Sequence, residues 1–175
     1  SHRGTGLRDF MMAGHGGDTL TGGGADDWLE GRDGADLLIG GGGNDWLWGG
    51  DADGAADTMI GGVGDDSMAG YDGDDQLRGD VGDDALFGHG GRDRLVAGVG
   101  ADQLTGGAGQ DTLLCGVDTD SDWVYYYDLA DGGDRIADFT AGVDRIALTF
   151  LRGLGVDAER FVGSAAAMTD AGAWI

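Results

Sequence analysis

Residues 61–88 read GGVGDDSMAGYDGDDQLRGDVGDDALFG, a stretch in which one short motif occurs three times. Each copy begins with glycine, continues to an aspartate pair, and places a single large apolar residue two positions after the second aspartate. The apolar residues are Met68, Leu77 and Leu86, nine residues apart. Because one such unit cannot bury its apolar side chain alone, the repeat predicts an array in which neighbouring units share a core.

The repeat continues through most of the chain. Its aspartates are Asp18, Asp27, Asp36, Asp45, Asp57, Asp66, Asp75, Asp84, Asp93, Asp102 and Asp111, and each is followed two residues later by Leu or Met. The spacing is nine except between Asp45 and Asp57, where an insertion makes it twelve. Asp9 and Met11 extend the register backwards as a degraded repeat. A disordered acidic tail has no reason to keep this phase, so the sequence predicts an ordered structure.

The spacing specifies a parallel β-solenoid. A strand of about three residues with an apolar centre points one side chain inward and two outward. The glycine-rich residues between strands then turn the chain back. Two nonapeptides make one coil of 18 residues, and stacked coils give two parallel sheets with the Leu/Met ladder between them. We therefore predict an all-β, right-handed parallel β-roll with a degraded entry repeat (1–12), repeats (13–114) and a C-terminal capping segment (115–175).

Composition limits the ligands that this array can bind. The chain has 40 Gly, no Pro, 33 acidic residues and a net charge of −23. Such a charge excludes a nucleic-acid surface and an anionic membrane, both of which attract basic residues. No apolar stretch is long enough to form a transmembrane segment. Stacked acidic loops repel one another, and their hard oxygen ligands suit Ca²⁺.

The segments GGGGNDWLW (40–48), GGVGDDSMA (61–69) and GGAGQDTLL (106–114) resemble the G-G-x-G-x-D-x-U-x repeat of RTX, or haemolysin-type, calcium-binding proteins. The resemblance covers roughly residues 9–114. It implies a β-roll in which Ca²⁺ lies between loops two repeats apart. The implied ligands are the carboxylates of the eleven aspartates from Asp18 to Asp111, with backbone carbonyls of Gly40, Gly43, Gly61, Gly64, Gly70, Gly73, Gly79, Gly82, Gly88, Gly91, Gly106 and Gly109.

Carried onto this chain, the resemblance implies two rows of loops. One row ends in Asp9, Asp27, Asp45, Asp66, Asp84 and Asp102, and the other in Asp18, Asp36, Asp57, Asp75, Asp93 and Asp111. Six loops leave five gaps in each row, so up to ten Ca²⁺ ions are expected, whose charge nearly balances −23. Ala25, Ala13 and Ala97 replace repeat glycines, so we expect weaker sites there and the best sites in Asp65–Asp111.

After residue 114 the pattern changes. DTDSD (118–122) is a further candidate ion site, and WVYYYDL, DRIADF (134–139) and DRIALTFL (144–151) predict longer strands with AGVD as a turn. This segment resembles the closing segment of RTX rolls in serralysin-type metalloproteases, which implies a cap over the open end of the solenoid. Cys115, the only cysteine, is predicted to be a small apolar filler.

Several functions remain open at this point. The sequence contains no catalytic motif, so we expect no enzyme in this segment, although its parent protein is expected to be a secreted hydrolase such as a metalloprotease, a lipase or a toxin. The resemblance implies export from a Gram-negative bacterium by type I secretion machinery, followed by calcium-driven folding that assists an upstream domain of the same polypeptide. An outward aromatic face of Phe10, Met12, Trp28, Trp46 and Trp48 suggests instead an adhesin or a carbohydrate-binding module.

Overall fold

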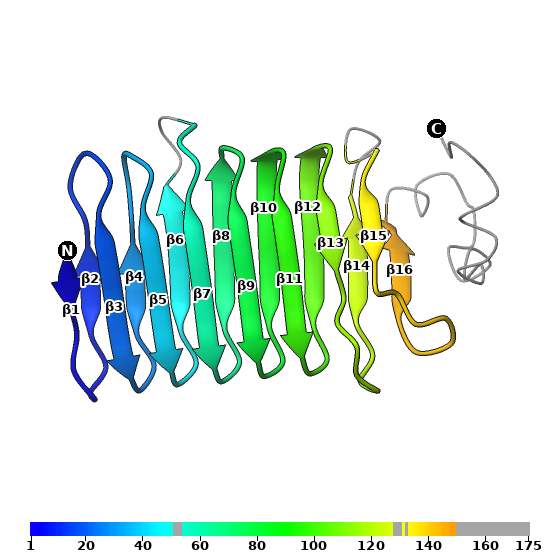
Figure 1. Ribbon diagram of the computed structural model, residues 1–175, viewed down its shortest axis with the longest axis horizontal. Helices are drawn as coiled ribbons and strands as arrows, with labels where there is room; N and C mark the ends of the chain where they lie inside the picture. Colours follow the sequence, from blue (N-terminus) through cyan, green and yellow to red (C-terminus); the bar gives the residue numbers. More distant parts are fainter. Residues whose placement is uncertain (51–53, 128–130, 132, 150–175) are drawn as a thin grey trace.

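The computed structural model describes residues 1–50, 54–127, 131 and 133–149, which form two parallel sheets of eight strands each (Figure 1). The first sheet contains β1 (His2–Arg3), β3 (Thr19–Gly24), β5 (Leu37–Gly42), β7 (Thr58–Val63), β9 (Gln76–Val81), β11 (Arg94–Val99), β13 (Thr112–Leu114) and β15 (Arg135–Ala137). The second contains β2 (Phe10–Met12), β4 (Trp28–Glu30), β6 (Trp46–Gly50), β8 (Ser67–Asp72), β10 (Ala85–Gly91), β12 (Gln103–Gly109), β14 (Trp123–Tyr126) and β16 (Arg145–Leu148). None of the described elements is a helix that could span a membrane.

Each coil of the chain contributes one strand to each sheet, which confirms the predicted β-solenoid. In the second sheet Leu86 lies beside Leu104, 18 residues later, and the same step joins most neighbouring strands. Between β5 and β7 the step is 21 residues, since Leu38 lies beside Met59, and the three extra residues correspond to the insertion in the sequence. Figure 1 shows the coils stacked from the blue N-terminal end to β16 in orange.

The core consists chiefly of one large apolar side chain from each repeat. The apolar residue of every repeat lies between the sheets with at most 1% of its surface exposed, in the order Leu20, Leu29, Leu38, Leu47, Met59, Met68, Leu77, Leu86, Leu95, Leu104 and Leu113. Val124 extends this row of buried side chains, and Met11, Ile136 and Ile146 pack against the row. Each coil therefore buries its apolar residues only against its neighbours, as the predicted array requires.

Most strands are longer than the three residues that we predicted. Strands β5, β7 and β9 each contain six residues, because the backbone stays paired through the first glycines of the following loop. Gly41, for example, lies in register with Gly62. Glycine tolerates this extension because it has no Cβ that would meet the neighbouring coil.

The backbone conformation at the fourth position of each loop explains why the repeat has glycine there. Gly64, Gly82 and Gly100 occupy it with φ of +127°, +136° and +138°, a conformation that residues with a Cβ rarely adopt. A Cβ added to Gly82 would collide with the carbonyl oxygen of Gly64 in the preceding coil. Ala25 occupies the same position with φ of +96°, so this loop carries backbone strain that its glycine counterparts avoid.

The described part of the C-terminal segment continues the solenoid. β14 and β16 extend the second sheet and β15 extends the first, all in parallel register. AGVD contains a turn, as predicted, at Gly142 and Val143. Cys115 is fully buried in the core, as its predicted role as a filler requires. The rest of the predicted capping segment, residues 150–175, lies outside the described residues.

The strain at the fourth loop position predicts opposite effects for two substitutions. Ala25→Gly should stabilise the folded chain by about 1 kcal/mol, because glycine adopts positive φ without steric cost. Gly82→Ala should destabilise it by about 1–3 kcal/mol, because it introduces both the strain and a backbone collision. Chemical unfolding of both variants in saturating Ca²⁺ measures the difference. Equal shifts in the same direction would contradict this account of the repeat.

Candidate metal sites along two edges

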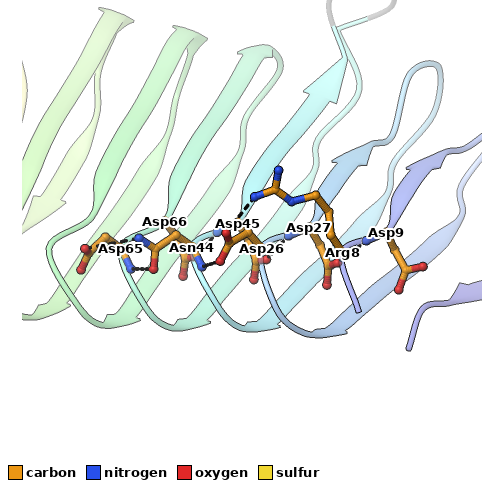
Figure 2. Close-up of polar contacts among 8 residues, drawn as sticks. All are labelled: Arg8, Asp9, Asp26, Asp27, Asn44, Asp45, Asp65 and Asp66. Carbon is orange, nitrogen blue, oxygen red and sulfur yellow. Dashed lines mark hydrogen bonds and ion pairs between the residues drawn. The ribbon is translucent and has the colours of Figure 1, made fainter. Parts of the chain in front are cut away.

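The aspartates of alternate repeats form a continuous ladder along one edge of the solenoid, which we call the first edge. The backbone N–H of Asp9 donates to Oδ1 of Asp27, that of Asp27 to Asp45, and that of Asp45 to Asp66, over distances of 2.7–2.8 Å (Figure 2). The same bond continues from Asp66 to Asp84 and Asp102. Each carboxylate therefore fixes the loop of the preceding coil.

The opposite, second edge is built in the same way. Its ladder runs through Asp18, Asp36, Asp57, Asp75, Asp93 and Asp111, and each backbone N–H donates to Oδ1 of the next aspartate over 2.6–2.8 Å. The structure thus places all eleven predicted aspartates in two rows, with the order that the resemblance implies. Whether these residues ligate a metal stays a prediction.

These carboxylates are withdrawn from solvent. Asp27, Asp45, Asp66, Asp84 and Asp102 on the first edge are at most 2% exposed, whereas Asp18 at the start of the second edge is only half-buried. Within the described part of the chain, the second oxygen has no hydrogen-bond partner in Asp27, Asp45, Asp66, Asp75, Asp84, Asp93, Asp102 and Asp111. A buried, uncompensated carboxylate oxygen is costly, and either a proton or a bound cation relieves that cost.

The pKa values of the ladder aspartates also show that burying these carboxylates in the ionised form is unfavourable. Burial chiefly, with a smaller contribution from neighbouring aspartates, raises the pKa of Asp45, Asp84 and Asp93 to about 7, although the backbone N–H that each carboxylate accepts opposes the shift. The pKa values of Asp66, Asp102 and Asp111 are raised to about 6, chiefly by burial. The ionised aspartates therefore destabilise the apo coil unless a positive charge lies between them.

The first glycine of each loop brings a second kind of oxygen to the carboxylate. A Cβ added to Gly40 would collide with Oδ2 of Asp45 and lie 2.8 Å from the carbonyl oxygen of Gly61 in the next coil. Gly79 and Gly88 stand in the same relation to Asp84 and Asp93. The predicted glycines of this set, namely Gly40, Gly61, Gly70, Gly79, Gly88 and Gly106, are all buried. Carboxylate and carbonyl oxygens thus approach one small space, which suits a hard cation.

The remaining predicted glycines occupy the fourth position of their loops. Gly43, Gly64, Gly73, Gly82, Gly91 and Gly109 all have positive φ. Their carbonyl oxygens point along the stack, since the carbonyl of Gly64 faces the Cα of Gly82 and that of Gly82 faces the Cα of Gly100. The loops therefore present backbone oxygens from two positions, as the resemblance implies.

A second, exposed ladder runs along the first edge and was not predicted. It uses the residue before each ladder aspartate: Asn44 N–H donates to Asp26 and Asp65 N–H to Asn44, both over 3.0 Å (Figure 2). Asp83 N–H donates in the same way to Asp65, over 3.0 Å. These bonds point toward the N-terminal end, opposite to those of the buried ladder. Neighbouring loops are consequently held by side-chain bonds in both directions, which fixes the width of the gap between them.

The N-terminal loop differs from the others. Asp9 uses Oδ2 to accept hydrogen bonds from the N–H and hydroxyl of Thr5, and Arg8 forms an ion pair with Asp26 at 2.8 Å (Figure 2). A carboxylate with these partners, beside an arginine, offers less to a cation. From this geometry we expect a weak site at the entry repeat.

Sequence reasoning missed three aspartates that continue the ladders. Asp102 N–H donates to Asp122 and Asp122 N–H to Asp144 on the first edge, while Asp111 N–H donates to Asp134 on the second. Of the three aspartates in DTDSD, Asp122 is therefore the ladder residue. A signal was present, because Asp122–Val124, Asp134–Ile136 and Asp144–Ile146 keep the repeat's aspartate-to-apolar spacing. Steps of 20, 22 and 23 residues concealed the register.

A comparison with known families agrees with this geometry. The model of the RTX calcium-binding nonapeptide repeat (4 copies) matches residues 3–38, 21–54, 51–86, 78–113 and 87–121. The chain belongs to this RTX repeat family. Its members bind calcium through these repeats and are typical of secreted proteins. No curated protein matches the chain. The unpartnered carboxylate oxygens and adjacent carbonyls of this RTX chain fit calcium, which prefers several oxygen ligands.

The buried ladder predicts unequal roles for two adjacent aspartates. Asp84→Asn should raise the Ca²⁺ midpoint of folding by about threefold to tenfold, because it removes a buried ligand charge. Asp83→Asn is the matched control, since the exposed Asp83 keeps its Oδ1 acceptor as asparagine and should shift the midpoint less than about twofold. Calcium titrations followed by circular dichroism compare the two variants. Equal shifts would show that total charge, and not the buried ladder, determines the affinity.

Proposed function

We propose that this chain is a calcium-gated folding module of a secreted bacterial protein. The observation that carries the proposal is the buried ladder, in which carboxylates of successive coils lie one above another with an oxygen left unpartnered. Without a cation, closing each coil buries a negative charge beside the next. Cations in the gaps between loops reverse this balance, so folding and metal binding become one equilibrium.

The gating follows from the calcium concentration on the two sides of the cell envelope. In the cytosol free Ca²⁺ is low, so the acidic chain stays unfolded and suited to export by type I machinery of a Gram-negative bacterium. Outside, calcium exceeds the affinity range of extracellular modules, about 10⁻⁴–10⁻³ M, and the roll forms. The folded roll then stabilises an upstream domain of the same polypeptide, for which a secreted protease, lipase or toxin is the proposed class. The activity belongs to that domain, and the roll itself is structural.

The decisive experiment is far-UV circular dichroism during a titration from chelator to millimolar Ca²⁺. We expect a cooperative transition from coil to β-structure, because each coil is stable only against its neighbours. Mg²⁺ is the control and should not produce it, since Mg²⁺ demands a compact octahedral site and gives up water reluctantly. A chain that is already β-rich in chelator and does not respond to Ca²⁺ would refute calcium gating.

A second candidate function uses the outer face of the second sheet. Phe10 is 64% exposed, Trp46 40% and Met12 44%, so the N-terminal coils present apolar side chains to solvent. Trp28 packs between its neighbours, with ring centroids 5.6 Å from Phe10 and 4.5 Å from Trp48. Exposed aromatic rings suit the apolar faces of sugars, so this surface supports a polysaccharide-binding role.

This alternative predicts that the folded chain is retained on a polysaccharide. Trp46→Ala should abolish retention in affinity electrophoresis through anionic or neutral glycan, because it removes the most exposed tryptophan of the aromatic face. Trp123→Ala, at 37% exposure in β14 near the other end of the solenoid, is the matched control and should retain binding. Unchanged mobility of the parent chain in every glycan, or equal losses in both variants, would exclude a specific role for the aromatic face.

A further inference from the structure

Cys115 lies at a loop position that is glycine or alanine in the other repeats. It stands nine residues after Gly106, at the first position of its loop, where Gly106 itself has no room for a Cβ because Oδ2 of Asp111 is too close. The loop from Cys115 to Asp122 is two residues longer than the loop from Gly106 to Asp111. This extra length leaves space for a side chain beside the ladder carboxylate, and the thiol fills it.

The thiol lies against two carboxylates in a fully enclosed place. Cys115 is 0% exposed, Asp122 1% and Asp144 3%, and one ligand atom from each residue lies within 4.8 Å of the other two. Among the described residues, the thiol of Cys115 has no disulfide and no hydrogen-bond partner. Neither Asp122 nor Asp144 forms an ion pair with a described arginine or histidine. Oδ1 of each accepts a backbone N–H from the preceding coil, and Oδ2 of Asp144 also accepts the N–H of Thr140 at 2.6 Å.

The chemistry of these three ligands differs from that of the other gaps. Elsewhere along both edges the donors are oxygens, which suit Ca²⁺, whereas a thiolate selects borderline or soft cations such as Zn²⁺ and Cd²⁺. Bond lengths of about 2.0–2.3 Å around tetrahedral zinc place its ligand atoms about 3.6 Å apart. The observed separations, all at most 4.8 Å, therefore need side-chain adjustments of about 1 Å.

We propose that Cys115, Asp122 and Asp144 form a binding site for one thiophilic divalent cation, Zn²⁺ being the natural candidate, at the C-terminal end of the first edge. The cation replaces the thiol proton and compensates two buried carboxylates, with water as its fourth ligand. The site is independent of calcium in the other gaps.

The test uses Cd²⁺ as a spectroscopic probe on the full chain in saturating Ca²⁺. Because Cys115 is the only cysteine, an ultraviolet sulfur-to-cadmium charge-transfer band reports on this site alone. We expect the band to saturate at one Cd²⁺ per chain, to vanish in Cys115→Ser, and to need about tenfold or more Cd²⁺ in Asp122→Asn and Asp144→Asn. Asp65→Asn, a substitution of an exposed residue several coils from the site, should leave the midpoint within about twofold.

A second measurement needs no substitution. Stoichiometric Zn²⁺ should slow alkylation of Cys115 in the parent chain at a denaturant concentration that opens the C-terminal coils but leaves the sample soluble. The proposal is overturned by the absence of a band, by saturation at half an equivalent, which indicates two thiols from two chains, or by a band that the aspartate variants do not weaken. Circular dichroism of each variant in Ca²⁺ verifies folding. A chain that folds in chelator would refute calcium gating without affecting the cadmium result.

Discussion

The repulsion between stacked aspartates is the constraint on which the rest of this structure depends. Parallel pairing sets neighbouring coils about 4.8 Å apart, so identical carboxylates recur at that interval along both edges. Two unit charges at this distance repel by about 1 kcal/mol in water and by several times more in a partly buried place. The core cannot offset this repulsion, because each repeat buries one apolar side chain and only against its neighbours. This repulsion is the reason for our proposal that cation binding and folding are one equilibrium in this chain.

The glycines follow from the same geometry. At the first position of a regular loop such as that of Gly40, a Cβ would collide with the carboxylate oxygen of Asp45. At the fourth position the backbone turns with positive φ, and the next coil passes directly above. The repeat thus encodes two separate requirements, which are space for a cation at one position and a left-handed turn at the other. Ala25 violates only the second, so its loop keeps the ladder bonds while carrying strain.

The sequence predicted the coil, the row of buried side chains and the order of the aspartates, because all three depend on a period that survives the insertion before Asp57. It did not predict features that depend on contacts between coils. The longer strands arise from glycine backbones pairing across coils, and the exposed ladder through Asp26, Asn44 and Asp65 arises from bonds to a neighbour 18 or 21 residues away. Asp122, Asp134 and Asp144 were missed because their loops vary in length. A search for a strict nine-residue period identifies the regular coils, whereas a search for the aspartate-to-apolar pair alone also identifies the irregular ones.

Irregular coils matter because a solenoid is stabilised only by nearest-neighbour contacts, so a change in one loop acts locally. At the N-terminal end, Thr5 donates to Oδ2 of Asp9, the carboxylate oxygen that has no hydrogen-bond partner in the central coils. At the C-terminal end, the longer loop admits Cys115 beside Asp122 and Asp144, which changes the donor set while the ladder bond to Asp102 is kept. The two ends can therefore differ in the ligand they require, while the central coils share one. Since each coil is held only by its neighbours, a loop that changes its contacts acts first on the coil beside it.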